Sequence, residues 1–153
     1  MNYMTALVQL PLVRETGKER VRSPDDVARL CADMTDLAQE TFQALALNTK
    51  NTLINRHLVT VGLADASLVH AREVFRPAIV DNSACIVLVH NHPSGDPTPS
   101  AEDIRITKQI IEAGKIIGIA VQDHVIIGKA TESSKGYLSM RESGLCDFAG
   151  HKA

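Results

Sequence analysis

An apolar run at Ala84–Val89 leads directly into a proline-rich loop, and a helical pattern follows the loop. The run is too short for a helix and is rich in β-branched residues, so it predicts a buried central strand. Residues 90–100 contain three prolines and a glycine, which fix one backbone path and resist both helix and sheet. Residues 101–113 then show helical spacing, and Gly114 is expected to close that helix. This succession favours an α/β fold.

The remaining elements are predicted from apolar periodicity and from turn residues. Strands are expected at 5–13, 41–47, 52–61, 116–121 and 125–127, with a last strand near 137–140, and helices at 23–39 and 68–80. The turn at 48–51 makes an antiparallel hairpin of the strands that flank it. Pro77 is expected to kink the helix around it or to end that helix early. The order of elements predicts an α/β fold with a mixed, largely antiparallel sheet flanked by helices.

The length of 153 residues fits one domain. We divide the chain into an N-terminal strand and linker at 1–22, a main domain at 23–145 and a flexible tail at 146–153. The hydrophobic fraction of 44% and the charged fraction of 22% are ordinary for a soluble globular protein and argue against disorder.

The charge pattern bears on the class of partner. A protein that grips phosphates usually shows a basic stripe, but the net charge here is −2 and the basic residues of 14–22 are interrupted by Glu15 and Glu19. Nucleic acid is therefore not expected as a direct, tight partner. No apolar segment reaches 18 residues and no signal peptide is visible, which predicts a cytoplasmic protein without membrane contact. The three cysteines are widely spaced and suggest neither a disulfide framework nor a cysteine-based zinc site.

Two histidines stand at the end of the predicted central strand. Alternate residues of a strand point to the same side, so His90 and His92 can aim their imidazoles at one point. Asp103 lies in the first turn of the following helix, close enough to supply a third ligand. Two neutral imidazoles and one carboxylate, with a fourth position left for water, are typical of a catalytic zinc site.

Each of these residues also has a plainer explanation. Ser100 and Asp103 fit a helix N-cap pattern, and Asp103 would gain from the helix dipole without any metal. The histidines could be ordinary residues of a turn. The letters His90-Asn91-His92 also spell the name of a nuclease motif, but the residues of that motif are dispersed, so a contiguous triplet is weak evidence for it. Taken together, the spacing favours a metal site, which we hold as a hypothesis.

The motif His90-x-His92-Pro93, followed by Ser100-x-x-Asp103, resembles that of the JAMM (JAB/MPN+) zinc metallopeptidases. The text "LVHNHPSGDPTPSAEDI", with "VQDHVIIG" downstream, is similar to the bacterial RadC family, and the resemblance covers about 23–145. It implies a single JAB/MPN-like (cytidine-deaminase-like) domain. It also implies roles for five residues: zinc ligands at His90, His92 and Asp103, a transition-state-stabilising serine at Ser100, and at Glu40 a glutamate that acts through the zinc-bound water.

The resemblance implies a zinc-dependent hydrolase of amide bonds, isopeptide bonds included, that uses a zinc-activated water on a protein or peptide substrate. Two alternatives stay open: a DNA-repair-associated accessory protein without hydrolysis, which is the family's label, and a non-catalytic zinc-bound interaction domain. Many RadC proteins also carry a helix-hairpin-helix module, and the residues before Ser23 are too few to form one.

Two glutamates compete for the role of general base. Glu73 is nearer in sequence to the histidines, but it lies mid-helix, away from the face that Phe75 and Ile79 are expected to bury. Glu40 begins the strand at 41–47 and matches the family's glutamate in "QETFQALALNTKN". We therefore predict Glu40 as the base.

Other polar residues near the motif are given lesser roles. Ser94 is a rival to Ser100, although plain turn chemistry explains it. Asp96 is expected to form the turn, with hydrogen bonding behind the ligands as its other open role. His124, beside Asp123, is placed near the site by the resemblance but is not counted as a ligand.

Overall fold

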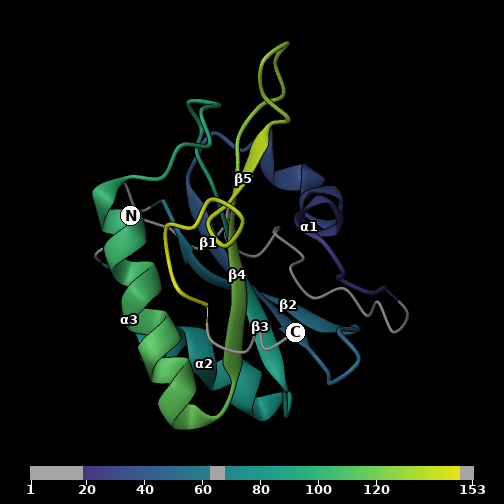
Figure 1. The fold of residues 1–153 in the computed structure, drawn as a ribbon, viewed down its shortest axis with the longest axis vertical. Coiled ribbons are helices and arrows are strands. Elements are labelled where there is room, and N and C mark those ends of the chain that lie inside the picture. The colour runs from purple at the N-terminus through teal and green to yellow at the C-terminus, as the bar shows by residue number, and fades with distance from the viewer. Residues whose placement is uncertain (1–18, 63–67, 149–153) are drawn as a thin grey trace, which may run out of the picture.

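The computed structural model describes residues 19–62 and 68–148, which form one mixed sheet with helices on both faces (Figure 1). The strands are β1 (Thr41–Leu47), β2 (Leu53–Val61), β3 (Cys85–Asn91), β4 (Ala120–Ile127) and β5 (Tyr137–Ser139). The helices are α1 (Pro24–Leu30), α2 (Ala71–Val80) and α3 (Ala101–Ile117), and a short 3₁₀ turn spans Ala32–Met34.

The sheet has the strand order β2-β1-β3-β4-β5. The pairs β1·β2, β1·β3 and β4·β5 are antiparallel, whereas β3 and β4 run parallel, with α3 between them in the chain. The predicted α/β class with a mixed, largely antiparallel sheet is therefore confirmed.

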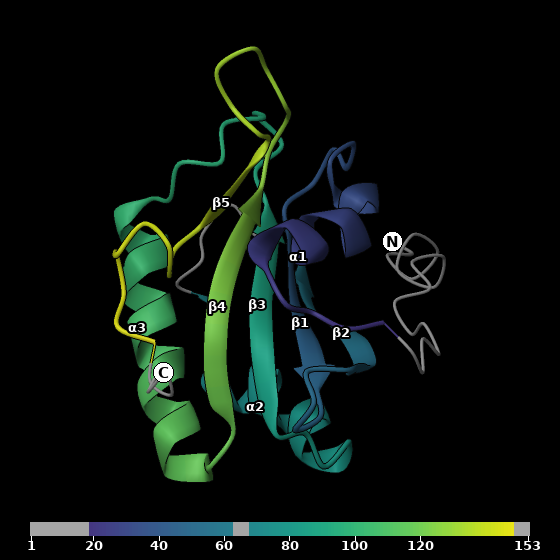
Figure 2. The ribbon, with the colours of Figure 1, turned by 45° about the vertical axis from the view of Figure 1, so that its right-hand side comes forward.

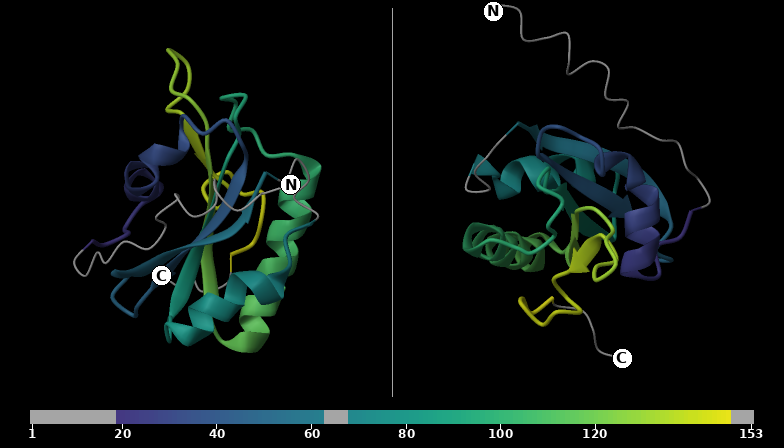
Figure 3. Two further views of the ribbon diagram at one scale, coloured as in Figure 1. Left: turned by 180° about the vertical axis from the view of Figure 1, so that it is seen from behind. Right: turned by 90° about the horizontal axis from the view of Figure 1, so that it is seen from above.

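The strand predicted from the apolar run lies at the centre of this sheet, and all of its residues are buried. Its side chains alternate between two cores: Ile86 and Leu88 pack with residues of α2 and α3, and Val87 and Val89 pack with residues of α1. Figure 2 shows α3 and α1 on opposite faces, and the view from above in Figure 3 separates the two layers. The strand continues past the predicted end at Val89 to Asn91, so His90 lies within it.

Helix α1 is shorter than the predicted span of 23–39. Its start is as expected, with Ser23 and Asp26 forming a capping box, but it ends at Leu30. The buried Arg56 guanidinium explains this end, because it donates to the Leu30 carbonyl (3.2 Å) and to Asp33 in the 3₁₀ turn (2.8 and 2.9 Å). The side chain thus satisfies a carbonyl that further helix would otherwise bond.

Helix α3 is longer than predicted, and the two strands expected at 116–121 and 125–127 are one strand, β4. The helix ends at Gly118, which adopts a left-handed conformation (φ 84°). Gly114 was predicted to close the helix but lies inside it, where a Cβ would come within 2.5 Å of the Ile119 carbonyl oxygen. Gly114 is therefore needed for close packing of α3 against the chain that enters β4.

Helix α2 continues through Pro77 to Val80, so the proline does not end it early. Its core face, Val74, Phe75 and Ala78, holds the helix against the sheet, whereas Ile79, which was predicted to be buried, is 55% exposed.

The described ends of the chain pack more closely than predicted. Glu19–Val21, predicted as part of a linker, bond to the chain at Asn51 and Leu53. The flexible tail expected from residue 146 is not seen at 146–148, since Cys146 and Phe148 are buried in the core. Residues 149–153 and the predicted strand at 5–13 lie outside the described residues. The three cysteines are buried and free, and within 19–62 and 68–148 no helix has the length and apolarity to cross a bilayer.

Candidate metal centre

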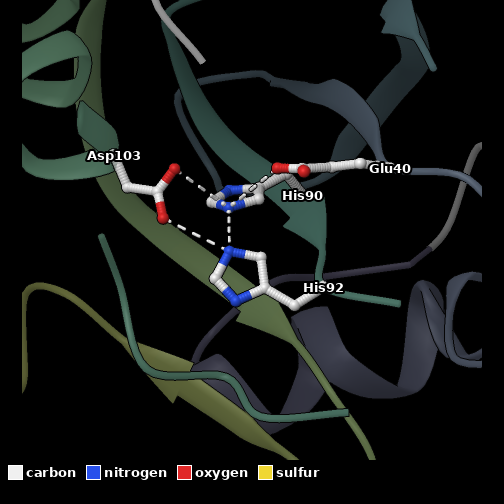
Figure 4. Close-up of side chains that lie close together, drawn as sticks. All are labelled: Glu40, His90, His92 and Asp103. Carbon is white, nitrogen blue, oxygen red and sulfur yellow. Dashed lines mark hydrogen bonds and ion pairs between the residues drawn. The ribbon is translucent and has the colours of Figure 1, made fainter. Parts of the chain in front are cut away.

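Three chain segments meet at one end of the sheet: the start of β1, the end of β3 and the start of α3 (Figure 1). Strands β1 and β3 are antiparallel with Phe42 opposite His90, so the residue before β1 lies close to the last residues of β3. In Figure 4 the side chains of Glu40, His90, His92 and Asp103 converge from these segments. Their ligand atoms all lie within 4.8 Å of one another.

The two histidines face each other through the same ring atom. His90 Nε2 lies 2.9 Å from His92 Nε2. The other nitrogen of His92, Nδ1, lies 2.8 Å from the backbone oxygen of Asp96 in the loop. Because a carbonyl only accepts, Nδ1 carries the proton in a neutral ring and Nε2 keeps its lone pair. The proline-rich loop thus turns the lone pair of His92 toward His90.

Asp103 is placed by the cap of α3. The hydroxyl oxygen of Ser100 accepts from the Asp103 amide (3.1 Å), and Asp103 Oδ2 accepts from the Ser100 amide (2.8 Å). This fixes the carboxylate with Oδ1 3.4 Å from His90 Nε2 and Oδ2 3.2 Å from His92 Nε2. Burial alone would raise the pKa of Asp103, but the two imidazoles hold it well below its usual range.

Glu40 approaches His90 from the side opposite Asp103 (Figure 4). It is more accessible than Asp103, with a quarter of its side chain exposed (26%). Its Oε1 lies 3.7 Å from His90 Nε2. Burial raises the pKa of Glu40, while the nearby histidines oppose that rise.

Asn91 fixes the backbone on both sides of Glu40. Its side-chain oxygen accepts from the amide (2.8 Å) and the hydroxyl (3.0 Å) of Thr41, and its Nδ2 donates to the Gln39 carbonyl (3.0 Å). The residue between the two histidines therefore points to the other face of β3 and holds the segment that carries Glu40.

The donor set fits a metal ion. Tetrahedral zinc with ligands at ~2.0–2.1 Å keeps its ligand atoms about 3.3 Å apart. The two Nε2 atoms lie 2.9 Å apart, and each has one oxygen of Asp103 at a similar spacing, Oδ1 at 3.4 Å from His90 and Oδ2 at 3.2 Å from His92. A neutral His92 presents a lone pair to His90 Nε2, so the 2.9 Å between the two nitrogens accommodates either a shared proton or a bound cation.

The structure brings together four of the five predicted site residues: Glu40, His90, His92 and Asp103. Ser100 stands beside them as the helix cap, using its oxygen as an acceptor, which leaves its hydroxyl proton for another partner. Its catalytic role stays a prediction. Glu73 lies on the exposed face of α2 and is not among the four.

Two further polar residues border the site and were not predicted as part of it: Asn91 and Thr107. The sequence offers a weak signal for Thr107, which is one helical turn after Asp103 and so shares its face. His124 was expected near the site, and its Nε2 lies 2.7 Å from His90 Nδ1. Asp123, its neighbour, accepts hydrogen bonds from the Ser139 hydroxyl and from two backbone amides and faces away from the four residues.

Comparison with known proteins gives a consistent family. Residues 21–145 match the family described as RadC-like JAB domain. UPF0758 protein GWCH70_2550 of Geobacillus sp. (strain WCH70) is 50% identical over 129 residues, which are 84% of this chain and 55% of that protein. UPF0758 protein lmo1549 of Listeria monocytogenes is 47% identical over 137 residues, 89% of this chain and 59% of that protein. The chain thus spans little more than half the length of these curated relatives.

Proposed function

Because the chain belongs to the RadC-like JAB domain family, we propose that it is a zinc-dependent hydrolase of amide bonds, in peptide or isopeptide linkage. The observation that carries the proposal is the convergence of Glu40, His90, His92 and Asp103, with all ligand atoms within 4.8 Å. The expected substrate is a protein or a peptide, and the expected compartment is the cytoplasm.

His90, His92 and Asp103 would hold the ion. Zinc in that position would lower the pKa of a bound water toward ~7 and polarise the carbonyl under attack. Glu40 would take the proton of the attacking water and pass it to the leaving amine. A half-buried carboxylate with a raised pKa suits this general-base role near neutral pH.

Ser100 would stabilise the charge that develops on the substrate oxygen. Its oxygen is occupied as an acceptor by the Asp103 amide, but its proton is free to be donated, and the residue is exposed at the start of α3. The helix cap and the catalytic role are therefore compatible, since they use different parts of one hydroxyl group.

A groove walled by the loop that holds His92, rather than by the four converging residues themselves, supports a peptide-sized substrate. It has a volume of about 740 Å³ and lies between the loop at 94–98 and the hairpin at 129–138. The same loop holds His92 through the Asp96 carbonyl, so the groove adjoins the candidate site. Tyr137, Leu138 and Pro97 give it apolar surface, and Lys129 lies on its wall.

The test is metal analysis together with hydrolysis. Chain purified without a metal-affinity tag should contain near-stoichiometric zinc, and it should cleave at least one member of a panel of fluorogenic peptides and ε-lysyl isopeptides. Lys129→Ala should raise the KM with little change in kcat, whereas Lys50→Ala, at the β1–β2 turn, should change neither. Iron or manganese in place of zinc, or loaded protein without turnover on the whole panel, would contradict the proposal.

The two alternatives make opposite predictions in the same preparation. A DNA-associated accessory protein would bind duplex DNA at nanomolar concentration with a steep dependence on salt, and would not hydrolyse the panel. A non-catalytic interaction domain would hold zinc without turnover. We expect weak, salt-sensitive DNA binding at most, because the net charge is −2.

A further inference from the structure

A chain of buried hydrogen bonds runs behind the metal centre. His90 Nδ1 lies 2.7 Å from His124 Nε2, and His124 Nδ1 lies 2.6 Å from the hydroxyl of Thr107. The same hydroxyl lies 2.6 Å from the backbone oxygen of Asp103. Thr107 and His124 have no exposed surface (0%), and His90 and Asp103 are 2% exposed. These hydrogen bonds therefore connect the backbone of Asp103 to the ring of His90 through groups that are shielded from water.

The donor and the acceptor of every hydrogen bond in this series follow from its last group, the backbone carbonyl of Asp103. A carbonyl oxygen only accepts, so the Thr107 hydroxyl donates to Asp103. A hydroxyl has one proton, so Thr107 must accept from His124 Nδ1. His124 has no exposed surface, and its two ring nitrogens bond to the Thr107 hydroxyl and to His90, neither of which carries a negative charge that would compensate a charged ring. The ring is therefore neutral, and a neutral ring protonated at Nδ1 has a lone pair at Nε2. That lone pair accepts from His90 Nδ1–H, which leaves His90 Nε2 unprotonated.

We propose that Thr107 and His124 are positioning residues that hold His90 in the one tautomer able to bind a metal through Nε2. The reversed chain would place a proton on His90 Nε2, the atom that faces His92 and Asp103, and would close that position to a metal. The proposal rests on the metal site of the proposed function, but it does not depend on hydrolysis.

Packing against Phe42 leaves the rings of His90 and His124 little freedom to rotate. Phe42 stacks on His90 with ring centroids 5.9 Å apart and meets the ring of His124 edge-on at 5.3 Å. Because packing restrains both rings, the tautomer is the property that remains to be set, and the hydroxyl of Thr107 sets it. Loss of such an outer contact typically weakens metal binding by ~10–100-fold.

The first measurement is zinc affinity by competition with a chelator. Thr107→Val keeps the shape of the side chain but removes the hydroxyl, and zinc should bind about 10–100-fold more weakly. Thr107→Ser restores the hydroxyl and should bind within about threefold of the original chain. Ser139→Ala is the matched control: it removes another buried hydroxyl, from Asp123, and should lower the melting temperature while leaving zinc affinity unchanged.

The second measurement needs no variant. Nitrogen-15 spectra of the histidine rings in the zinc-free and zinc-loaded chain should show His90 and His124 protonated at Nδ1. His90 protonated at Nε2 in the zinc-free chain, or Thr107→Val binding zinc as tightly as the original chain, would overturn the proposal. If the original chain took up no zinc, the proposed function would fail, while the zinc-free spectra would still decide the direction of the hydrogen-bond chain.

Discussion

Asp103 and Asp123 are almost equally buried, at 2% and 3% exposure, but their oxygens meet different kinds of atoms. Asp123 accepts from the Ser139 hydroxyl (2.6 Å), from the His124 amide (2.7 Å) and from the Arg141 amide (3.1 Å). Asp103 accepts from the Ser100 amide, but it also faces the Nε2 atoms of His90 and His92.

The difference separates a carboxylate that protein donors compensate from a candidate metal ligand. A buried charge must be compensated, and Asp123 is compensated by protein donors alone. Next to Asp103, His92 Nε2 presents a lone pair when its ring is neutral, and His90 Nε2 does so in the tautomer proposed above, so a cation is the natural partner. Burial and residue type do not distinguish the two aspartates, whereas the number of available donors does.

The largest effect expected from this comparison is on metal content. Asp103→Asn should lose most of the zinc and with it the hydrolysis, because an amide is a poor ligand in place of the carboxylate. Asp123→Asn should keep the zinc but lower the free energy of unfolding by ~1–3 kcal/mol, because one amide group then lacks a proper partner. Elemental analysis and denaturant melts of both variants give the two readouts.

The comparison would break if the variants behaved alike. Retention of zinc by Asp103→Asn would remove this aspartate from the ligand set, and loss of zinc from well-folded Asp123→Asn would show that both carboxylates serve the metal. His92→Ala, expected to lose zinc, provides the positive control.

The next effect concerns the base. Glu40→Gln should keep zinc and fold but lower kcat by about 10²–10⁴-fold, the usual contribution of a general base. Glu73→Gln, on the exposed face of α2, should change none of these properties. Zinc content, melting temperature and turnover on one cleavable substrate decide the matter, and activity lost in Glu73→Gln but kept in Glu40→Gln would reverse the assignment.

A smaller effect on rate is expected at Ser100. Ser100→Ala should lower kcat by ~10²–10³ through loss of one donor to the substrate oxygen. It should also cost ~0.5–2 kcal/mol of stability through loss of the cap. Ser23 forms the same kind of capping box on α1, so Ser23→Ala should show the loss of stability without the loss of rate. Equal kcat in the two variants would show that Ser100 acts only as the helix cap and takes no part in catalysis.

The sequence was sufficient to predict that His90, His92 and Asp103 converge, because their geometry is local. His90 and His92 point to the same side because strand residues alternate, and Asp103 lies in the first turn of a helix whose start is indicated by Ser100 as the N-cap. The same local signals misplaced Gly114, since a glycine that ends a helix and one that permits close packing look alike in one sequence. Only the contact with the Ile119 carbonyl separates the two cases.

The supporting residues were harder to predict because they act across the fold. Asn91 contacts Thr41, fifty positions earlier in the chain, and Thr107 contacts His124 on β4. No pattern of hydrophobicity marks such pairs, because each is a buried polar contact. The first arises from the pairing of β1 with β3, and the second from the packing of α3 on β4. The candidate ligands could therefore be predicted from motifs, whereas the groups that orient them could not.

The smallest effect expected concerns pH, and its sign depends on the metal. Burial alone would lower the pKa of His92, but the Asp103 carboxylate and the Asp96 carbonyl raise it above its ordinary value of 6.5. In zinc-free chain this raised pKa contributes stability that is fully present below about pH 6.5 and is lost as the pH rises through the folded-state value. Zinc instead requires neutral imidazoles, so zinc-loaded chain should lose stability as the pH falls.

Melting temperatures between about pH 6.5 and 8, measured with a chelator and with zinc, should therefore change in opposite directions. Below that range the buried His124, whose pKa is lowered, makes the zinc-free chain lose stability as the pH falls as well. Asp103 does not disturb this window, because its pKa is lowered from 3.8 and its contribution is lost only in stronger acid. His92→Ala should remove the His92 contribution from the zinc-free curve and should abolish the stabilisation by zinc. Asp123→Asn should keep both slopes at a lower melting temperature. Parallel curves with and without zinc in the original chain would show that protons and metal do not compete at His92, and His92 would then lose its place among the candidate ligands.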